Sequence, residues 1–160
     1  MIKGVKIKKL IVHQDIFDEK EKVEQPGFLM EILRNDEDLL KKFGQTTFTV
    51  AYPGTIKAFH WHKKQDDLWF VATGQAMVVL YDLRKDSPTK GETQVIMAGE
   101  GDYKLIVIPA GVAHGYKVLS KKPVLLFYHT TETYNPKNPD EERIPFDDSQ
   151  IGFDWSVKDR

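Results

Sequence analysis

The sequence predicts an all-β domain, either a sandwich or a barrel of short strands. Nine short runs are rich in β-branched and aromatic residues, and turn-forming pairs such as Pro-Gly, Thr-Gly, Lys-Gly and Ala-Gly separate them. Several runs also alternate between apolar and polar side chains, as a strand with one buried face does. The chain has 160 residues, a length that fits one domain over residues 1–160.

The predicted strands follow one another with short connections. They cover residues 4–12, 27–34, 46–52, 56–62, 67–73, 76–83, 93–97, 103–109 and 123–130. The run 56–62 shows the alternation clearly, because side chains two residues apart in a strand point to the same face. One face of this run carries Ile56, Ala58, His60 and His62. The other face carries Lys57, Phe59 and Trp61.

One short helix is predicted over residues 35–44. Asn35 can cap its first turn, which carries three acidic side chains that suit the positive end of a helix. Lys41 and Lys42 lie in the last turn, and Gly44 then provides a C-terminal stop.

The C-terminal part of the chain changes in character. After about Tyr134 it becomes polar and rich in proline, and it ends in the segment "IGFDWSVKDR". We expect Phe153 and Trp155 to order this tail by packing on the barrel.

Composition excludes several classes of function. The 23 Lys and Arg residues nearly balance the 24 Asp and Glu residues, which argues against binding to nucleic acid or to a membrane surface. The absence of cysteine excludes disulfides and thiolate metal sites and fits a reducing compartment. The N-terminus is too charged for a signal peptide, and no apolar run approaches the roughly 18 residues of a membrane span. These features predict a cytoplasmic protein.

Three histidines and one aspartate form the first candidate site. His60 and His62 point the same way on one predicted strand, Asp67 opens the next strand, and His114 follows a Pro-x-Gly turn. Three imidazoles and a carboxylate suit one divalent transition metal. The spacing from Gly54 to Gly74, together with "PAGVAH", resembles the two cupin motifs. That resemblance implies a cupin-type double-stranded β-helix, a jelly-roll barrel. The alternative is that these histidines are polar fillers or surface residues.

A longer resemblance covers most of the chain, from "GFLMEIL" to "DDSQIGFDW". Its carriers are Gln45, "IKAFH" at 56–60, "YDLRKDSPTKGE" at 81–92, "IPAGVAHGYKVLS" at 108–120 and "LFYHTTETYNP" at 126–136. In this order and at this spacing, the blocks resemble the dTDP-4-dehydrorhamnose 3,5-epimerase family, whose members are metal-independent cupins. Epimerisation beside a ketone needs a base, an acid on the opposite face and stabilisation of the enolate. Histidine suits the base, because its ordinary pKa is about 6.5.

The resemblance implies a role for six residues. His60 would be the catalytic base and Tyr128 the catalytic acid. The substrate-binding positions would be Gln45, Lys57, His114 and Tyr134. The implied substrate is a nucleoside-diphosphate 4-keto-6-deoxyhexose used in surface polysaccharide synthesis. The reaction would need no cofactor, and the protein would be a homodimer that shares its N-terminal strands.

Departures from the family pattern keep other hypotheses open. Lys57 stands where the family has an arginine, and Asp67 stands where it has a lysine. The aspartate that orients the family's catalytic histidine has no clear counterpart, although Asp159 lies nearest in sequence. A His62–Asp67 ion pair beside His60 could replace that aspartate. A metal-dependent cupin enzyme with His60, His62, Asp67 and His114 as ligands and a non-catalytic sugar-binding barrel therefore remain alternatives.

Overall fold

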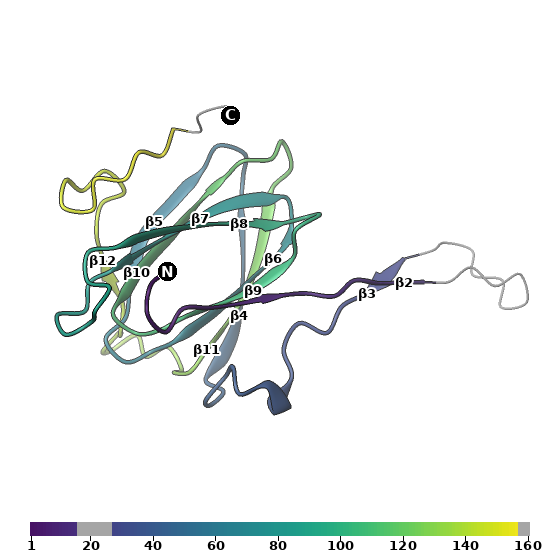
Figure 1. Ribbon diagram of the computed structural model, residues 1–160, viewed down its shortest axis with the longest axis horizontal. Coiled ribbons are helices and arrows are strands. Elements are labelled where there is room, and N and C mark those ends of the chain that lie inside the picture. The colour runs from purple at the N-terminus through teal and green to yellow at the C-terminus, as the bar shows by residue number, and fades with distance from the viewer. Residues whose placement is uncertain (16–26, 157–160) are drawn as a thin grey trace, which may run out of the picture.

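The computed structural model describes residues 1–15 and 27–156 and shows two five-stranded sheets packed face to face (Figure 1). The first sheet has the order β1 (Lys6–Lys9), β9 (Lys104–Ile108), β6 (Asp67–Thr73), β11 (Val124–Thr130) and β4 (Gln45–Ala51). The second has the order β12 (Glu142–Arg143), β5 (Ile56–Trp61), β10 (Val112–Val118), β7 (Gln75–Asp82) and β8 (Thr93–Gly99). A separate ribbon pairs β2 (His13–Gln14) with β3 (Phe28–Leu29).

The strands connect as in a jelly-roll barrel made of two sheets. Every strand pair is antiparallel, and the chain crosses between the sheets at most of its connections from β4 to β11. This layout confirms the predicted all-β class. Strand β10 is not among the strands that the sequence predicts, because "VAHGYKV" follows a Pro-x-Gly turn and has no regular strand pattern. Gly115 interrupts its apolar pattern, and a Cβ there would lie 2.3 Å from Cβ of Ala58 on the paired strand.

Both faces of the central strands are buried, which explains their continuous apolar runs. Between the sheets lie side chains such as Trp69, Val78, Leu80, Ile106 and Leu126. The outer face of the second sheet is covered by the C-terminal segment, in which Trp155 is 6% exposed and packs against Phe59 at a ring distance of 5.4 Å. This contact confirms the predicted packing of the tail. Residues 30–40 cover the outer face of the first sheet.

The predicted helix over residues 35–44 is wrong in extent. Only a 3-10 helix forms, Asn35–Glu37, and it begins after Arg34, so Asn35 is not its cap. The acidic side chains form ion pairs with basic side chains nearby: Glu37 contacts Lys8 at 2.6 Å, and Asp36 contacts Arg34 at 2.7 Å. Asp38 has a left-handed backbone (φ 50°) and ends the turn. Leu39 and Leu40 then pack against the sheet, so tertiary contacts replace a second helical turn.

The N-terminal strand takes an edge of its own chain's barrel. β1 pairs with β9 in the register Lys6 to Val107, and its other side borders no strand among the described residues. A homodimer therefore stays a prediction. No helix within the described ranges is long and apolar enough to cross a membrane.

Candidate active site

A deep pocket opens between the two sheets. Its volume is about 880 Å³, within the range of small-molecule sites. Every site residue predicted from the sequence lines it, namely Gln45, Lys57, His60, His62, Asp67, His114, Tyr128 and Tyr134. The structure thus brings together residues that lie up to 89 positions apart in the chain. Their individual roles remain predictions.

The two sheets contribute different chemistry to the pocket. His60 on β5 lies directly opposite His114 on β10 in the second sheet. Tyr128 on β11 pairs with Trp69 on β6 in the first sheet. The predicted base and the predicted acid therefore stand on opposite walls. Trp69 contributes an aromatic surface, with ring distances of 5.0 Å to His114 and 6.4 Å to Tyr128.

Lys57 reaches the pocket in spite of its position in the strand. Simple alternation places it on the face opposite His60, and that prediction is wrong. The pairing of β5 with β10 is irregular here: His114 lies opposite His60, while Tyr116, two residues on, lies opposite Lys57, three residues away. This bulge places Lys57 and His60 on the same side. The Lys57 ammonium donates to Thr49 Oγ1 and to the carbonyl of Val50, both at 3.0 Å.

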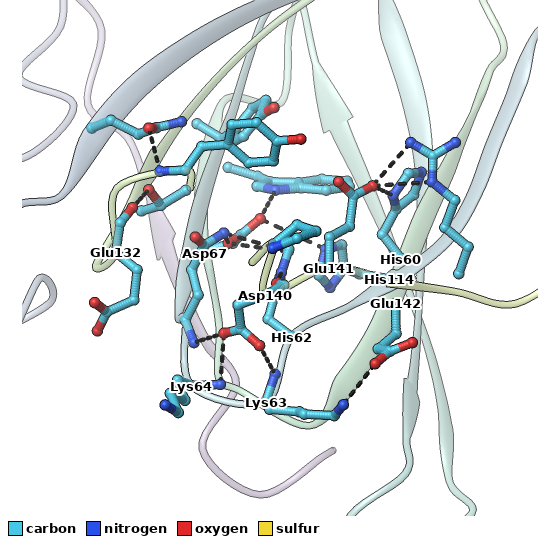
Figure 2. Close-up of a pocket in the computed structure, with 18 of the residues that line it drawn as sticks. His60, His62, Lys63, Lys64, Asp67, His114, Glu132, Asp140, Glu141 and Glu142 are labelled. Carbon is cyan, nitrogen blue, oxygen red and sulfur yellow. Dashed lines mark hydrogen bonds and ion pairs between the residues drawn. The ribbon is translucent and has the colours of Figure 1, made fainter. Parts of the chain in front are cut away.

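Glu141 is the residue that contacts His60, and sequence analysis missed it. Oε1 of Glu141 lies 2.6 Å from Nδ1 of His60 (Figure 2). Burial alone would raise the pKa of the Glu141 carboxyl, but hydrogen bonding and the charges of His60 and Arg143 outweigh burial and lower that pKa. An ionised Glu141 fixes the Nδ1–H tautomer of His60 and leaves Nε2 free to accept a proton.

The carboxylate that contacts His60 is therefore Glu141. Asp67 does not take that position, because it lies against His62 and His114 instead. Asp159 lies outside the described residues. No local signal marks Glu141, which stands in the polar, proline-rich segment just before β12 and reaches His60 only through the fold.

His62, Asp67 and His114 form a second buried cluster at one end of the pocket. Nε2 of His62 is 3.8 Å from Oδ1 of Asp67, and Nε2 of His114 is 3.6 Å from Oδ2. Burial lowers the pKa of His114 to about 4, in spite of the opposing charge of Asp67. His114 is therefore neutral near pH 7. Three of the four residues predicted as alternative metal ligands meet here, and His60 is not part of the cluster.

Two tyrosines supply hydroxyl groups to the pocket. Burial raises the pKa of Tyr128, so its hydroxyl stays protonated at neutral pH. Burial also raises the pKa of Tyr116 to about 12. The Tyr116 hydroxyl is the one fully buried side-chain polar atom among the described residues that lacks a hydrogen-bond partner. Buried hydroxyl groups without a partner are rare in folded proteins, and Tyr116 is one of the residues that line the pocket.

The rim of the pocket is held by the segment from Asp140 to Arg143. The Asp140 carboxylate accepts the backbone N–H groups of Lys63, Lys64 and Gln65 at 2.8, 2.9 and 3.0 Å, which fixes the turn after β5. Burial opposes ionisation of Asp140, but these hydrogen bonds lower its pKa. At another part of the rim, Gln45 Oε1 accepts the backbone N–H of Tyr134 at 2.8 Å.

These features define a class of protein. A two-sheet antiparallel barrel with a histidine–glutamate pair on one wall and a tyrosine on the other is a cupin-type pocket equipped for proton transfer. Comparison with known proteins agrees. The chain belongs to the dTDP-4-dehydrorhamnose 3,5-epimerase family, whose model matches residues 8–160. The predicted family, the jelly-roll fold and the isomerase class of enzyme are thereby confirmed.

Two curated relatives match nearly the whole chain. The spore coat polysaccharide biosynthesis protein SpsL of Bacillus subtilis is 55% identical over 100% of both chains. The probable low-salt glycan biosynthesis epimerase Agl13 of Haloferax volcanii is 36% identical, over 90% of this chain and 94% of its own length.

Solved structures show the same barrel. A dTDP sugar isomerase from Desulfovibrio desulfuricans superposes with a TM-score of 0.84 at 28% identity, over 99% of this chain and 94% of that chain. A dTDP-6-deoxy-D-glucose-3,5-epimerase from Legionella pneumophila, solved in complex with dTDP-4-keto-L-rhamnose, has a TM-score of 0.78 at 27% identity. That match covers 98% of this chain and 80% of the Legionella chain.

Proposed function

We propose that this protein epimerises a dTDP-linked 4-keto-6-deoxyhexose by proton transfer at a carbon next to the ketone, as a step in the synthesis of a surface polysaccharide. The observation that carries this proposal is the opposed arrangement of His60 and Tyr128, which come from different sheets and line one pocket. Inversion at carbon requires a base on one face of the sugar and an acid on the other. The pocket supplies both.

His60 is the proposed base. Its Nδ1–H is held by Glu141, so Nε2 carries the lone pair that takes the proton bound to carbon. The Glu141 carboxylate also stabilises the imidazolium that forms. The electrons of the broken C–H bond move onto the ketone oxygen and form an enolate.

Tyr128 is the proposed acid. Its raised pKa keeps the proton on the hydroxyl until the enolate carbon takes it from the opposite face. The tyrosinate then regains a proton from solvent, and His60 releases its own. Only protons move in this sequence, so the side chains of the pocket suffice without a redox cofactor. Gln45, Lys57 and Tyr134 are the proposed substrate contacts, and His114, the fourth position that the resemblance implies, lies in the cluster with His62 and Asp67.

Deuterium exchange tests the two roles separately. The purified protein is incubated in deuterated water with dTDP-4-keto-6-deoxyglucose, and mass spectrometry measures deuterium in the recovered sugar while NMR measures its configuration. We expect His60→Asn to reduce both exchange and inversion by about 10²- to 10⁴-fold. Tyr128→Phe should reduce inversion by a similar factor and retain exchange, because His60 can still remove and return a proton on one face.

The control is Tyr103→Phe, which removes a tyrosine hydroxyl outside the pocket. An active wild type whose exchange survives in His60→Asn would overturn the assignment of the base. A wild type that binds the nucleotide sugar and gives no exchange would favour the non-catalytic sugar-binding barrel. The homodimer remains a prediction that gel filtration with light scattering tests.

A further inference from the structure

The cluster of His62, Asp67 and His114 performs no step in the proposed reaction, yet its three side chains are buried and lie close together. All three side chains are buried, at 9%, 2% and 2% exposure. Their ligand atoms lie within 4.8 Å of one another. Within residues 1–15 and 27–156, no other three His, Cys, Asp or Glu side chains gather in this way.

Backbone carbonyls fix the tautomers of both histidines. Nδ1 of His62 contacts the carbonyl of Asp140, and Nδ1 of His114 lies 3.0 Å from the carbonyl of Val112. Because a carbonyl only accepts, each Nδ1 carries a hydrogen, and Nε2 is the ring nitrogen left to act as a ligand. Both Nε2 atoms lie next to Asp67 (Figure 2). An Nδ1–H bonded to a carbonyl is the arrangement that orients histidine ligands toward a metal.

The centre of the cluster brings together the Nε2 atoms of two imidazoles and one carboxylate. The Trp69 indole donates to Oδ2 of Asp67 at 3.1 Å. The Gln65 amide donates to Oδ1 of Asp67 at 2.8 Å and lies 3.4 Å from Nε2 of His62, so it occupies part of the space between them. Among the described residues, no hydrogen bond reaches Nε2 of His114.

We propose that His62, Asp67 and His114 bind one divalent first-row transition ion, such as Mn²⁺, Fe²⁺ or Zn²⁺, at the wall of the pocket. Two nitrogen ligands and one carboxylate that leave coordination positions open are typical of such sites. Ligands about 2.0–2.2 Å from a metal are about 3–3.5 Å from each other. The observed separations from Asp67 are 3.6 and 3.8 Å, and all three ligand atoms lie within 4.8 Å of one another, so the side chains would move inward on binding the ion.

His60 stays outside this site, because Glu141 holds its Nδ1 and its ring is not part of the cluster. A metal ion and a free base can thus coexist in one pocket, whereas the sequence presents them as competing interpretations. His62, Asp67 and His114 line the same pocket as His60 and Tyr128. We infer that the ion attracts the oxygen of the substrate's ketone; this role, unlike the metal site itself, rests on the proposed function.

Titration of the full-length protein with Mn²⁺ and Zn²⁺, after chelator treatment and dialysis, tests the site. Calorimetry and elemental analysis should give about one ion per chain, as for other built metal sites. His62→Gln and Asp67→Asn should each weaken binding by at least about 10- to 100-fold. His60→Asn and His129→Gln are the matched controls and should bind like the wild type, since His129 bonds Thr46 away from the pocket.

A second readout guards against loss of folding. Zn²⁺ should raise the melting temperature of the wild type and of His60→Asn, and it should leave that of a folded Asp67→Asn unchanged. Absence of binding in the wild type overturns the site. Binding that survives in Asp67→Asn, or that His60→Asn abolishes while His62→Gln retains it, overturns the ligand assignment.

The deuterium-exchange assay separates this proposal from the proposed function. Exchange that depends on His60 in a protein that binds no metal would overturn the metal site alone. Metal binding with exchange unchanged by chelator would support the site and overturn its role at the ketone. Metal binding in a protein that gives no exchange would support the site and overturn the proposed epimerisation.

Discussion

Two buried aspartates, Asp82 at the end of β7 and Asp67 at the start of β6, serve different purposes in this barrel. Both are almost inaccessible, at 0% and 2% exposure. Asp82 accepts hydrogen bonds of 2.6–3.1 Å from the backbone and guanidinium of Arg84 and from the hydroxyls of Ser87 and Thr89. Among the described residues, Asp67 accepts hydrogen bonds from Gln65 and Trp69, and its carboxylate lies 3.8 Å from Nε2 of His62 and 3.6 Å from Nε2 of His114.

The difference is between a buried carboxylate with many hydrogen-bond donors and one with few. The donors around Asp82 outweigh its burial and hold its pKa well below the ordinary value. They also tie down the connection after β7, and Arg84 donates further to the carbonyl of Lys3 at the N-terminus. Asp67 retains acceptor capacity that its neighbours do not use. A buried group with all its partners stabilises the fold, whereas a buried group with partners missing indicates a ligand.

The largest expected effect comes from exchanging the two aspartates for asparagine in parallel. Asp82→Asn should cost about 3 kcal/mol of unfolding free energy at neutral pH, because Arg84 loses its partly buried counter-charge. Asp67→Asn in chelator should change stability by less than about 1 kcal/mol, because the new amide can donate to the Nε2 lone pair of His114. Urea denaturation measures both values. Equal losses in the two variants would contradict the distinction drawn between them.

Acid should reduce the difference in unfolding free energy between the wild type and Asp82→Asn. The folded-state pKa of Asp82 lies below its unfolded value near 4, so the unfolded chain binds the proton more readily. The contribution of Asp82 is therefore fully present above about pH 4 and is lost as the pH falls below that value. Denaturation at pH 6 and near pH 3 should show the smaller difference at the lower pH. A constant difference would mean that charge is not the source of the stabilisation.

Glu141 provides the next test, because it lines the pocket and acts through its contact with His60. Glu141→Gln should lower kcat/KM by about 10- to 100-fold, as loss of a partner that orients a functional histidine does. The value of kcat should fall by a similar factor with KM little changed, because the imidazolium that Glu141 stabilises forms only during the reaction. Glu142→Gln is the matched control, because Glu142 binds Lys63 at 2.6 Å. A loss that falls mainly on KM would indicate a merely structural role.

The sequence predicts those parts of the fold whose local pattern agrees with their tertiary contacts. Strands with strong local patterns were found, because burial on one or both faces leaves a period in the sequence. The predicted helix over residues 35–44 does not form. Its capping and charge signals are overridden by the Lys8–Glu37 contact and by the packing of Leu39 and Leu40. Local propensity decides an element only where tertiary contacts do not oppose it.

The site divides in a similar way. His60, His114 and Tyr128 stand in contiguous blocks whose order resembles a known family, so they could be named in advance. Glu141 could not, because its contact with His60 spans 81 residues and depends on how the tail returns to the barrel. Side-chain geometry also shows that His60 lies outside the cluster of His62, Asp67 and His114. Spacing in the sequence alone places all three histidines in one set.

The smallest expected effect tests whether an unpartnered group really indicates a ligand. Tyr116→Phe removes the buried hydroxyl that has no protein partner, so it should leave stability unchanged or raise it by up to about 1 kcal/mol. If that hydroxyl bonds the sugar, KM for the nucleotide sugar should rise by about 5- to 10-fold with kcat little changed, the signature of lost uniform binding. Tyr103→Phe controls for loss of a hydroxyl outside the pocket. A stability loss with unchanged KM would mean that Tyr116 serves the fold, and the equation of missing partners with ligand contact would fail at this position.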